Sequence, residues 1–275
     1  MRFRLIAADL DNTLLDENSK VSGRTRETIQ KAVSRGVKFT IATGRMFKTS
    51  VDYMDDLGLG CDWPLINYHG AMIKTAKTEK VILHRPLANR AAIDVIAEAN
   101  RKSLHVSMFI GDNLYVREEN KYTRYYHSLT GIELQPVGDL ISFLERKKVN
   151  PTKLSIVSWD GQVDEMETYL KEKYGNKFSI LQSRPYFLEI TDRKATKGQA
   201  LRWLAEQEGI KAEEIIAFGD GYNDIDMLDY AGLGVAVANA RPEVLKTAAL
   251  VTGPHHEDGV ADIIEKYVLN YQCEI

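Results

Sequence analysis

The chain has 275 residues, enough for one large domain or two smaller ones. Hydrophobic residues make up 44% of it and charged residues 27%, which is the ordinary balance of a globular protein. The formal net charge of −3 gives no reason to expect a nucleic acid or a membrane as partner. It does not exclude an anionic substrate, because a bound cation can supply the positive charge that the composition lacks.

Cysteine usage and the N-terminus bear on location. Cys61 and Cys273 lie far apart and match neither a disulfide framework nor a metal-ligand set, so we expect two reduced thiols. The N-terminal apolar run is short and meets an acidic residue at Asp9, unlike a signal peptide, and no apolar stretch is long enough to cross a bilayer. We therefore expect a cytoplasmic protein with a small-molecule partner, either a monomer or a homodimer.

The N-terminal part alternates apolar runs of strand length with amphipathic stretches of helix length. This pattern predicts an α/β chain with a mainly parallel sheet. Ser22 is a suitable N-cap and Gly36 a stop signal for the first helix. The predicted elements are a strand over 3–8, a helix over 24–35, a strand over 37–42, a helix over 46–57 and a strand over 65–68.

The middle of the chain has a different pattern. Residues 106–117 form two alternating runs around Gly111-Asp112-Asn113, which predicts a β-hairpin. Strands joined by hairpins, with two or so helices, indicate a smaller α+β unit, which we place at 86–189. Its predicted elements are strands over 153–159, 178–182 and 186–190 and a helix over 163–174.

From residue 191 the alternating pattern resumes. The predicted elements there are helices over 197–207, 224–230 and 260–268 and strands over 215–218 and 234–238. The predicted fold is therefore α/β, with a Rossmann-like parallel-sheet core formed by 1–85 and 190–275. An α+β cap domain of residues 86–189 is inserted into this core.

Four polar clusters follow apolar strands or open helices. In an open parallel sheet the carboxyl ends of the strands line one crevice, where ligands bind, so residues far apart in sequence can meet there. The clusters are Asp9-Leu10-Asp11-Asn12-Thr13, Thr43-Gly44-Arg45, Lys197-Gly198 and Gly219-Asp220-Gly221-Tyr222-Asn223-Asp224.

The carboxylates of these clusters predict a metal ion. Asp9, Asp11, Asp220 and Asp224 would repel one another if they converged, unless a cation intervened. All four offer hard oxygen ligands, and no histidine or cysteine stands beside them in the sequence. This donor set favours Mg²⁺ over zinc.

The same residues suit phosphate chemistry. Lys197 opens a helix, where its ammonium and the free backbone N–H groups can both meet phosphate oxygens, and Thr43 and Gly44 offer further donors. Attack by Asp9 on a phosphate ester would give an aspartyl phosphate and split the hydrolysis into two steps. Asp11 could protonate the leaving group and then activate the hydrolytic water.

These motifs, in this order, resemble the four motifs of the haloacid dehalogenase superfamily, and an insert of about 100 residues between the second and third resembles its Cof-type phosphatases with a IIB-type cap. The resemblance implies that Asp9 is nucleophile and metal ligand, and that Asp11 is the acid/base and binds metal through its backbone carbonyl. It implies that Asp220 binds Mg²⁺ with support from Asp224. The implied phosphate-binding residues are Leu10 (backbone N–H), Thr43, Gly44, Lys197 and Asn223.

Two residues near these motifs have open roles. His69 stands where relatives usually carry asparagine, and we favour a satisfied surface or hinge histidine over a substrate contact. Arg45 can contact substrate or brace the acidic site, and we favour bracing. His255 and His256 are adjacent, and adjacent side chains seldom ligate one ion together, so we interpret them as part of a loop.

In the insert, Tyr122 has the spacing to share a helical face with Tyr125 or Tyr126. We expect that face to pack in the cap core, although one ring can instead contact substrate. Arg184 and Tyr186 are further candidates for substrate contact, and the sequence does not decide their role.

The predicted function is Mg²⁺-dependent hydrolysis of small phosphorylated metabolites, such as sugar phosphates, phosphorylated cofactors or nucleotides, with the cap selecting the substrate. A phosphomutase of the same superfamily would return the phosphate to the substrate. A phospho-accepting receiver module would retain the phosphate as its output and needs no cap. A regulatory protein that had lost catalysis is disfavoured, because all four motifs are intact.

Overall fold

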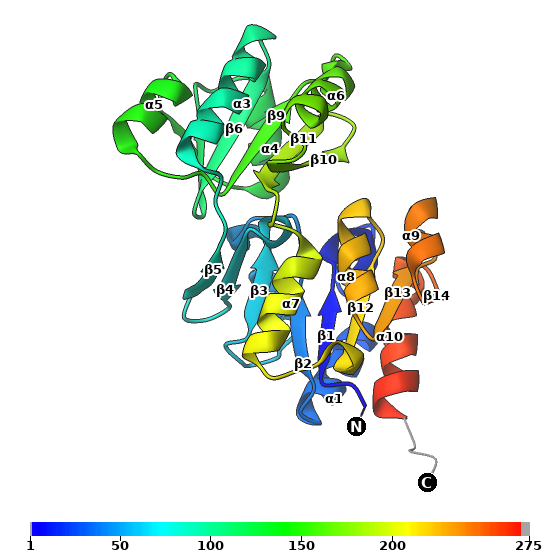
Figure 1. The fold of residues 1–275 in the computed structure, drawn as a ribbon. Helices are drawn as coiled ribbons and strands as arrows, with labels where there is room; N and C mark the ends of the chain where they lie inside the picture. Colours follow the sequence, from blue (N-terminus) through cyan, green and yellow to red (C-terminus); the bar gives the residue numbers. More distant parts are fainter. Residues whose placement is uncertain (1, 271–275) are drawn as a thin grey trace. The chain divides into compact units, whose positions relative to one another are not determined.

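The computed structural model describes residues 2–270, which fall into two compact units (Figure 1). Unit 1 comprises Met1–Arg45, Ser50–Ile82 and Thr196–Ile275, and unit 2 comprises Met46–Thr49 and Leu83–Ala195. Unit 2 extends beyond the predicted insert of 86–189 at both ends.

A five-stranded parallel sheet forms the centre of unit 1. Its strand order is β14-β13-β12-β1-β2, and its central strands β1 and β12 are apolar because both of their faces are buried. The first four residues of this sheet, Leu-Ile-Ala-Ala, have no exposed surface. The strands are β1 (Leu5–Ala8), β2 (Lys38–Ile41), β12 (Ile215–Gly219), β13 (Leu233–Val237) and β14 (Leu250–Thr252).

Strand order places the polar clusters at one edge of this sheet. β1 pairs with β2 on one side and with β12 on the other, so the chain changes direction across the sheet at β1. In the β1–β12 register Ala8 lies opposite Phe218, and the residues that follow these strands therefore leave the sheet together. This is the topological switch point at which open α/β sheets bind ligands.

The helices of unit 1 begin largely where the sequence predicts. The Ser22 hydroxyl accepts a hydrogen bond from the backbone N–H of Thr25 and caps α1, as expected. α7 has the predicted bounds and packs along α8. The helices are α1 (Gly23–Ser34), α2 (Asp52–Asp56), α7 (Lys197–Gln207), α8 (Ile225–Tyr230), α9 (Pro242–Thr247) and α10 (Gly259–Ile264).

The prediction of one helix over 46–57 was wrong. The segment contains a 3₁₀ turn, Phe47–Thr49, and the short helix α2. The Thr49 hydroxyl donates to the carbonyl of Met46, and Ser50 is hydrogen-bonded to the buried side chain of Asn67. Such side-chain bonds compete with a regular helix.

A small second sheet follows the parallel one. It has the order β3-β4-β5, with strands β3 (Pro64–Asn67), β4 (Met72–Thr75) and β5 (Val81–His84), of which the sequence predicted only the first. A parallel bridge between Ala42 and Ile66 joins β3 to the chain that leaves β2. The tight turn between β3 and β4 carries His69.

Unit 2 is an α+β unit around a mixed six-stranded sheet of order β10-β11-β9-β6-β7-β8. Its apolar core lies between the sheet and the helices α3, α5 and α6. It contains four helices rather than the two or so predicted. The elements are α3 (Asn89–Arg101), β6 (His105–Ile110), β7 (Asn113–Val116), α4 (Lys121–Thr130), β8 (Leu134–Pro136), α5 (Leu140–Lys147), β9 (Lys153–Val157), α6 (Gln162–Tyr174), β10 (Phe178–Arg184) and β11 (Phe187–Asp192).

Two further findings concern the sequence-based expectations about location. Among residues 2–270, no helix combines the length and apolar character that crossing a bilayer requires. Cys61 is exposed and carries a free thiol, whereas Cys273 lies outside the described residues.

Candidate active site

The first polar cluster forms an irregular turn directly after β1. Asp9 ends the extended segment, and the turn Leu10–Leu14 that follows is not regular: Asp11 has an extended ψ of 127° and Asn12 a φ of 57°. Asparagine tolerates this left-handed conformation better than most residues. Its carbonyl accepts a hydrogen bond from the side chain of Asn239 at 2.8 Å, which fixes the turn from outside.

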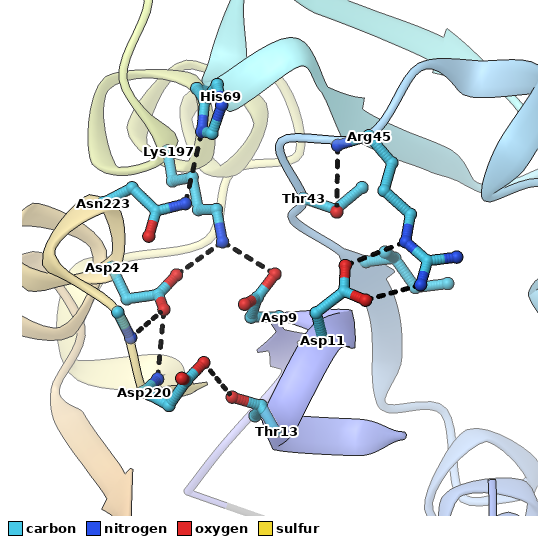
Figure 2. Close-up of polar contacts among 12 residues, drawn as sticks. Asp9, Asp11, Thr13, Thr43, Arg45, His69, Lys197, Asp220, Asn223 and Asp224 are labelled. Atoms are coloured by element: carbon cyan, nitrogen blue, oxygen red, sulfur yellow. Dashed lines mark hydrogen bonds and ion pairs between the residues drawn. The ribbon is translucent and has the colours of Figure 1, made fainter. Parts of the chain in front are cut away.

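A buried lysine bridges two of the predicted carboxylates. The Lys197 ammonium, at the start of α7, lies 2.7 Å from Asp9 Oδ1 and 2.6 Å from Asp224 Oδ1 (Figure 2). Lys197 and Asp224 have no exposed surface, and Asp9 is 6% exposed. Thr196 caps α7 by accepting a hydrogen bond from the backbone N–H of Gln199, which holds the lysine at the first helical position.

The glycine-rich loop after β12 is built around Asp224. Its Oδ2 accepts hydrogen bonds from the backbone N–H groups of Asp220, at 3.0 Å, and Gly221, at 2.9 Å, while Oδ1 faces Lys197. Asp220 also accepts a hydrogen bond from the Thr13 hydroxyl at 3.1 Å. Asp224 therefore positions both Lys197 and Asp220, and Thr13, to which the sequence assigned no role, ties the first cluster to the fourth.

Burial and mutual repulsion raise the pKa values of two carboxyl groups in this cluster. Burial raises the pKa of Asp9 well above its ordinary value; Lys197 opposes this rise, and the carboxylates of Asp224 and Asp220 add to it. Burial and the nearby Asp224 likewise raise the pKa of Asp220 to about 6. Burial disfavours the charged form of Lys197, but Asp224 and Asp9 hold its pKa above the ordinary value.

These residues form a fitting site for a divalent cation. Asp9, Asp220 and Asp224 each offer a carboxylate oxygen within 4.8 Å of the others. Three carboxylates and one ammonium carry a formal charge of −3 + 1 = −2, which a divalent cation would neutralise. The donors are hard oxygens, the set that Mg²⁺ prefers.

Asp11 is oriented toward an arginine rather than toward this cluster. Arg45 Nε lies 2.8 Å from Asp11 Oδ2 and Arg45 Nη2 lies 2.5 Å from Asp11 Oδ1, a bidentate pair (Figure 2). Burial opposes the charge on Arg45, but the hydrogen bonds that it donates to Asp11 keep its pKa above the ordinary value. The favoured interpretation of Arg45 as a brace thus agrees with its contacts.

The second cluster meets His69 at close range. The backbone N–H of Arg45 donates to the Thr43 hydroxyl at 3.2 Å, which closes the turn after β2. A Cβ atom at Gly44 would lie 2.2 Å from His69 Cε1, so only glycine fits between this turn and the imidazole. The steric reason for glycine in Thr43-Gly44-Arg45 is therefore a residue outside the motif.

His69 is part of the site and not a surface residue, and that part of the expectation was wrong. It is 6% exposed and has a φ of 57°, a left-handed conformation in which asparagine and histidine are enriched. Its Nδ1 accepts a hydrogen bond from the side-chain amide of Asn223 at 3.2 Å. His69 therefore orients a residue of the fourth motif.

Comparison with known proteins identifies the family of this chain. A family model described as haloacid dehalogenase-like hydrolase matches residues 6–264. The chain belongs to the haloacid dehalogenase-like hydrolases. This confirms the family resemblance of the four motifs and, with it, the predicted α/β fold class.

Relatives of this haloacid dehalogenase-like hydrolase are named as phosphatases. A Haemophilus influenzae protein whose name assigns it provisionally as a phosphatase is 33% identical over 97% of this chain and 98% of its own. YitU of Bacillus subtilis, a 5-amino-6-(5-phospho-D-ribitylamino)uracil phosphatase, is 28% identical over 96% of this chain and 97% of its own. The protein is accordingly an enzyme of the phosphoric monoester hydrolase class, a phosphatase of Cof type.

Solved structures agree. A haloacid dehalogenase-like hydrolase from Bacteroides thetaiotaomicron is 29% identical, with a TM-score of 0.85 over 96% of this chain and 99% of its own. A protein from Thermotoga maritima is 30% identical, with a TM-score of 0.85 over 98% and 99%. A third, described as a subclass IIB sugar phosphatase of the same superfamily, is 25% identical, with a TM-score of 0.82 over 96% and 98%.

Three tyrosines of this hydrolase's unit 2, Tyr122, Tyr125 and Tyr126, lie on α4. Tyr126 meets the rings of Phe109 and Phe187 edge-on, at centroid distances of 6.0 and 6.4 Å, and so packs against the sheet. It is not among the residues of the apolar core of unit 2, where we expected this face to pack. Tyr122 stacks on His105 with ring centroids 5.5 Å apart. The hydroxyl groups of Tyr125 and Tyr186 are joined by a hydrogen bond of 2.9 Å. These side chains, with the exposed Trp159, form one aromatic cluster, and Arg184 is exposed.

Proposed function

We propose that this phosphatase hydrolyses small phosphate monoesters with Mg²⁺, through an aspartyl phosphate formed on Asp9. The observation that carries the proposal is the buried Lys197 ammonium between Asp9 and Asp224, with Asp220 alongside, at the carboxyl ends of β1 and β12. A nucleophilic carboxylate at this place has an ammonium as charge partner and two further carboxylates that can share a metal ion with it, and it lies at the switch point of the sheet, where open α/β sheets bind ligands.

The first chemical step is attack by an Asp9 carboxylate oxygen on phosphorus. A new Asp9 O–P bond forms, the bond from phosphorus to the substrate oxygen breaks, and Asp11 gives that oxygen a proton. Lys197 holds Asp9 Oδ1 and lies where negative charge accumulates on the transferring phosphoryl group.

The second step releases inorganic phosphate. Asp11, now ionised, takes a proton from a water molecule whose oxygen attacks phosphorus, and the Asp9 O–P bond breaks to restore the carboxylate. Between the steps the phosphoryl group is held by the donors that the family motifs imply. We propose that these are the backbone N–H of Leu10, Thr43, the backbone N–H of Gly44, Lys197 and Asn223.

Asp9, Asp220 and the backbone carbonyl of Asp11 would hold the cation, with Asp224 in support. When bound, Mg²⁺ screens the repulsion between the nucleophilic carboxylate and the phosphate dianion and orients the phosphoryl group. The charge of −2 on the three carboxylates and Lys197 supports this assignment.

We further propose a cytoplasmic enzyme whose cap, residues 86–189, selects the substrate. Two observations support a small phosphorylated metabolite: YitU is named for a phosphorylated ribitylaminouracil, and a structural neighbour is described as a sugar phosphatase. The aromatic cluster of Tyr122, Tyr125, Trp159 and Tyr186 gives unit 2 rings on which a flat or apolar part of a metabolite can pack.

The test is release of inorganic phosphate from 4-nitrophenyl phosphate and from a panel of sugar, nucleotide and cofactor phosphates. We expect release with Mg²⁺, none with EDTA, and a loss of at least about a thousandfold in Asp9→Asn. Conversion of a sugar phosphate to an isomer without release of free phosphate would contradict hydrolysis and would favour a phosphomutase, which returns the phosphate to the substrate. If EDTA left phosphate release unchanged, the proposed requirement for Mg²⁺ would be wrong.

A further inference from the structure

A second group of side chains that could hold a metal ion lies in unit 1 and shares no residue with the acidic cluster. His255 and His256 belong to the 3₁₀ turn His255–Glu257, between β14 and α10 (Figure 1). Glu17 comes from the loop that follows the Asp9–Thr13 motif. Each of the three offers one ligand atom within 4.8 Å of the other two. The proposed hydrolysis uses none of them.

The adjacency of the two histidines argues against a shared ion only if their rings point apart. The two rings are nearly perpendicular, at 88°, with centroids 5.2 Å apart, and one ring nitrogen of each lies within 4.8 Å of the other. The third donor, Glu17, is brought to them by the fold and could not be recognised from the sequence. The interpretation of this pair as an ordinary loop left that carboxylate out.

One of the imidazoles is already oriented as metal-binding histidines usually are. His255 Nδ1 lies 2.7 Å from the carbonyl oxygen of Leu15, which can only accept, so Nδ1 carries the proton. In the neutral ring Nε2 then holds the lone pair. A hydrogen bond from the other ring nitrogen to a backbone carbonyl is the usual support of a histidine ligand, because it fixes both tautomer and ring orientation.

We propose that Glu17, His255 and His256 bind a zinc ion, with water completing the coordination. Two imidazoles and one carboxylate form a set that zinc accepts, whereas Mg²⁺ prefers oxygen ligands alone. Ligand atoms on one zinc lie roughly 3.3 Å apart, so the present spacing has to contract by about 1.5 Å at most. Glu17 and His256 are exposed side chains and have the freedom to do so.

A zinc ion at this site would link the segment after β1, which carries Asp9 and Asp11, to the C-terminal part of unit 1. The backbone N–H of His255 donates to Asn239 Oδ1 at 3.0 Å, and Asn239 Nδ2 donates to the Asn12 carbonyl at 2.8 Å. With the bond from His255 to Leu15, the histidine turn already contacts the segment that carries Asp9 and Asp11. Zinc bound to Glu17 would add a third link, so its effect is on stability rather than on the chemical step.

The experiment is a calorimetric titration of the metal-stripped full chain with Zn²⁺ in saturating Mg²⁺, which occupies the acidic cluster. We expect one zinc per chain and a higher melting temperature. His256→Ala and Glu17→Gln should each weaken zinc binding by about tenfold or more and leave Mg²⁺-dependent phosphate release unchanged. His127→Ala is the matched control, since His127 is an exposed histidine whose Nδ1 also contacts a carbonyl, that of Ile132.

Two results would overturn the proposal. The first is the absence of zinc binding once Mg²⁺ is saturating. The second is zinc binding that persists in His256→Ala and Glu17→Gln but disappears in Asp220→Asn, since the zinc would then occupy the acidic cluster. In ¹⁵N-resolved NMR spectra, the proposal also requires that zinc shift the Nε2 signal of His255 more than that of His127.

Discussion

Arg45 holds both carboxylate oxygens of Asp11, the proposed acid and base, at 2.8 and 2.5 Å. A bidentate arginine pair holds a carboxylate in one orientation. This arrangement suits the second step, in which Asp11 takes a proton from water. In the first step Asp11 has to carry a proton, so at least one of the bonds to Arg45 must be given up before the leaving group departs.

The acid role of Asp11 predicts that the effect of replacing it depends on the leaving group of the substrate. Asp11→Asn should slow the hydrolysis of an alkyl phosphate about 10²–10⁴-fold, because an alkoxide needs a proton to leave. Formation of the aspartyl phosphate from 4-nitrophenyl phosphate should be slowed much less, because nitrophenolate leaves unprotonated. Single-turnover measurement of the two esters checks this. An equal loss in that step for both would contradict the acid role of Asp11.

Arg45 itself should act through Asp11. Arg45→Ala should lower kcat about tenfold for an alkyl phosphate, because Asp11 loses its fixed orientation. Arg45→Lys should restore little, since an ammonium cannot make the paired bonds of a guanidinium. If Arg45→Ala changed KM but not kcat, we would conclude that Arg45 contacts the substrate and does not orient Asp11.

The stability of the metal-free enzyme should depend on pH through the acidic cluster. The pKa of Asp220 is about 6 in the folded protein and 3.8 ordinarily, so between these values the folded state binds more protons than the unfolded state. Protonated Asp220 therefore adds roughly 1–3 kcal/mol to the free energy of unfolding. This contribution is fully present below pH 3.8 and is lost as the pH rises through 6. The raised pKa of Asp9 acts in the same direction.

Thermal or urea unfolding with EDTA between pH 4.5 and 7.5 measures this loss. Because other carboxylates contribute opposite slopes, the test compares wild type with Asp220→Asn, which should lack this part of the slope and be the more stable protein at pH 7 without metal. Saturating Mg²⁺ should reverse the order at pH 7. If the free energy of unfolding had the same pH dependence in both proteins, Asp220 would not contribute to this loss of stability.

Gly44 and His69 should be coupled in stability. Gly44→Ala places a methyl group 2.2 Å from His69 Cε1 and should destabilise the protein by about 1–3 kcal/mol. In a His69→Ala background the same change should cost less than about 1 kcal/mol, because the ring is gone. A double-mutant cycle from urea unfolding measures the difference. Additive effects would contradict the steric account of this glycine.

Much of the core could be predicted from the sequence because its signals are local. α7 has the bounds expected from the run after Thr196, and the central strands β1 and β12 are apolar and buried on both faces. The meeting of Asp9, Asp220 and Asp224 also followed from strand ends, since parallel strands deliver their carboxyl ends to one edge. Lys197 joins them from the start of α7.

Other features depend on tertiary contacts that a motif does not record. The orientation of Asp11 depends on Arg45, and the place of His69 depends on a turn whose φ values are positive. Glu17 meets His255 only because the last loop folds back onto the first. α3 is different: Ala92, Ile93, Ile96 and Ala99 already had helical spacing, so that helix could have been recognised.

The aspartyl phosphate on Asp9 is the central claim, and trapping it is the most direct test. In Asp11→Asn this intermediate should accumulate, because the water that hydrolyses it lacks its base. Acid quenching within one turnover of 4-nitrophenyl phosphate, followed by peptide mass spectrometry, should show one phosphoryl group on Asp9 and none in the Asp9→Asn Asp11→Asn double variant. A phosphoryl group on another residue, or undiminished phosphate release by purified Asp9→Asn, would contradict the account.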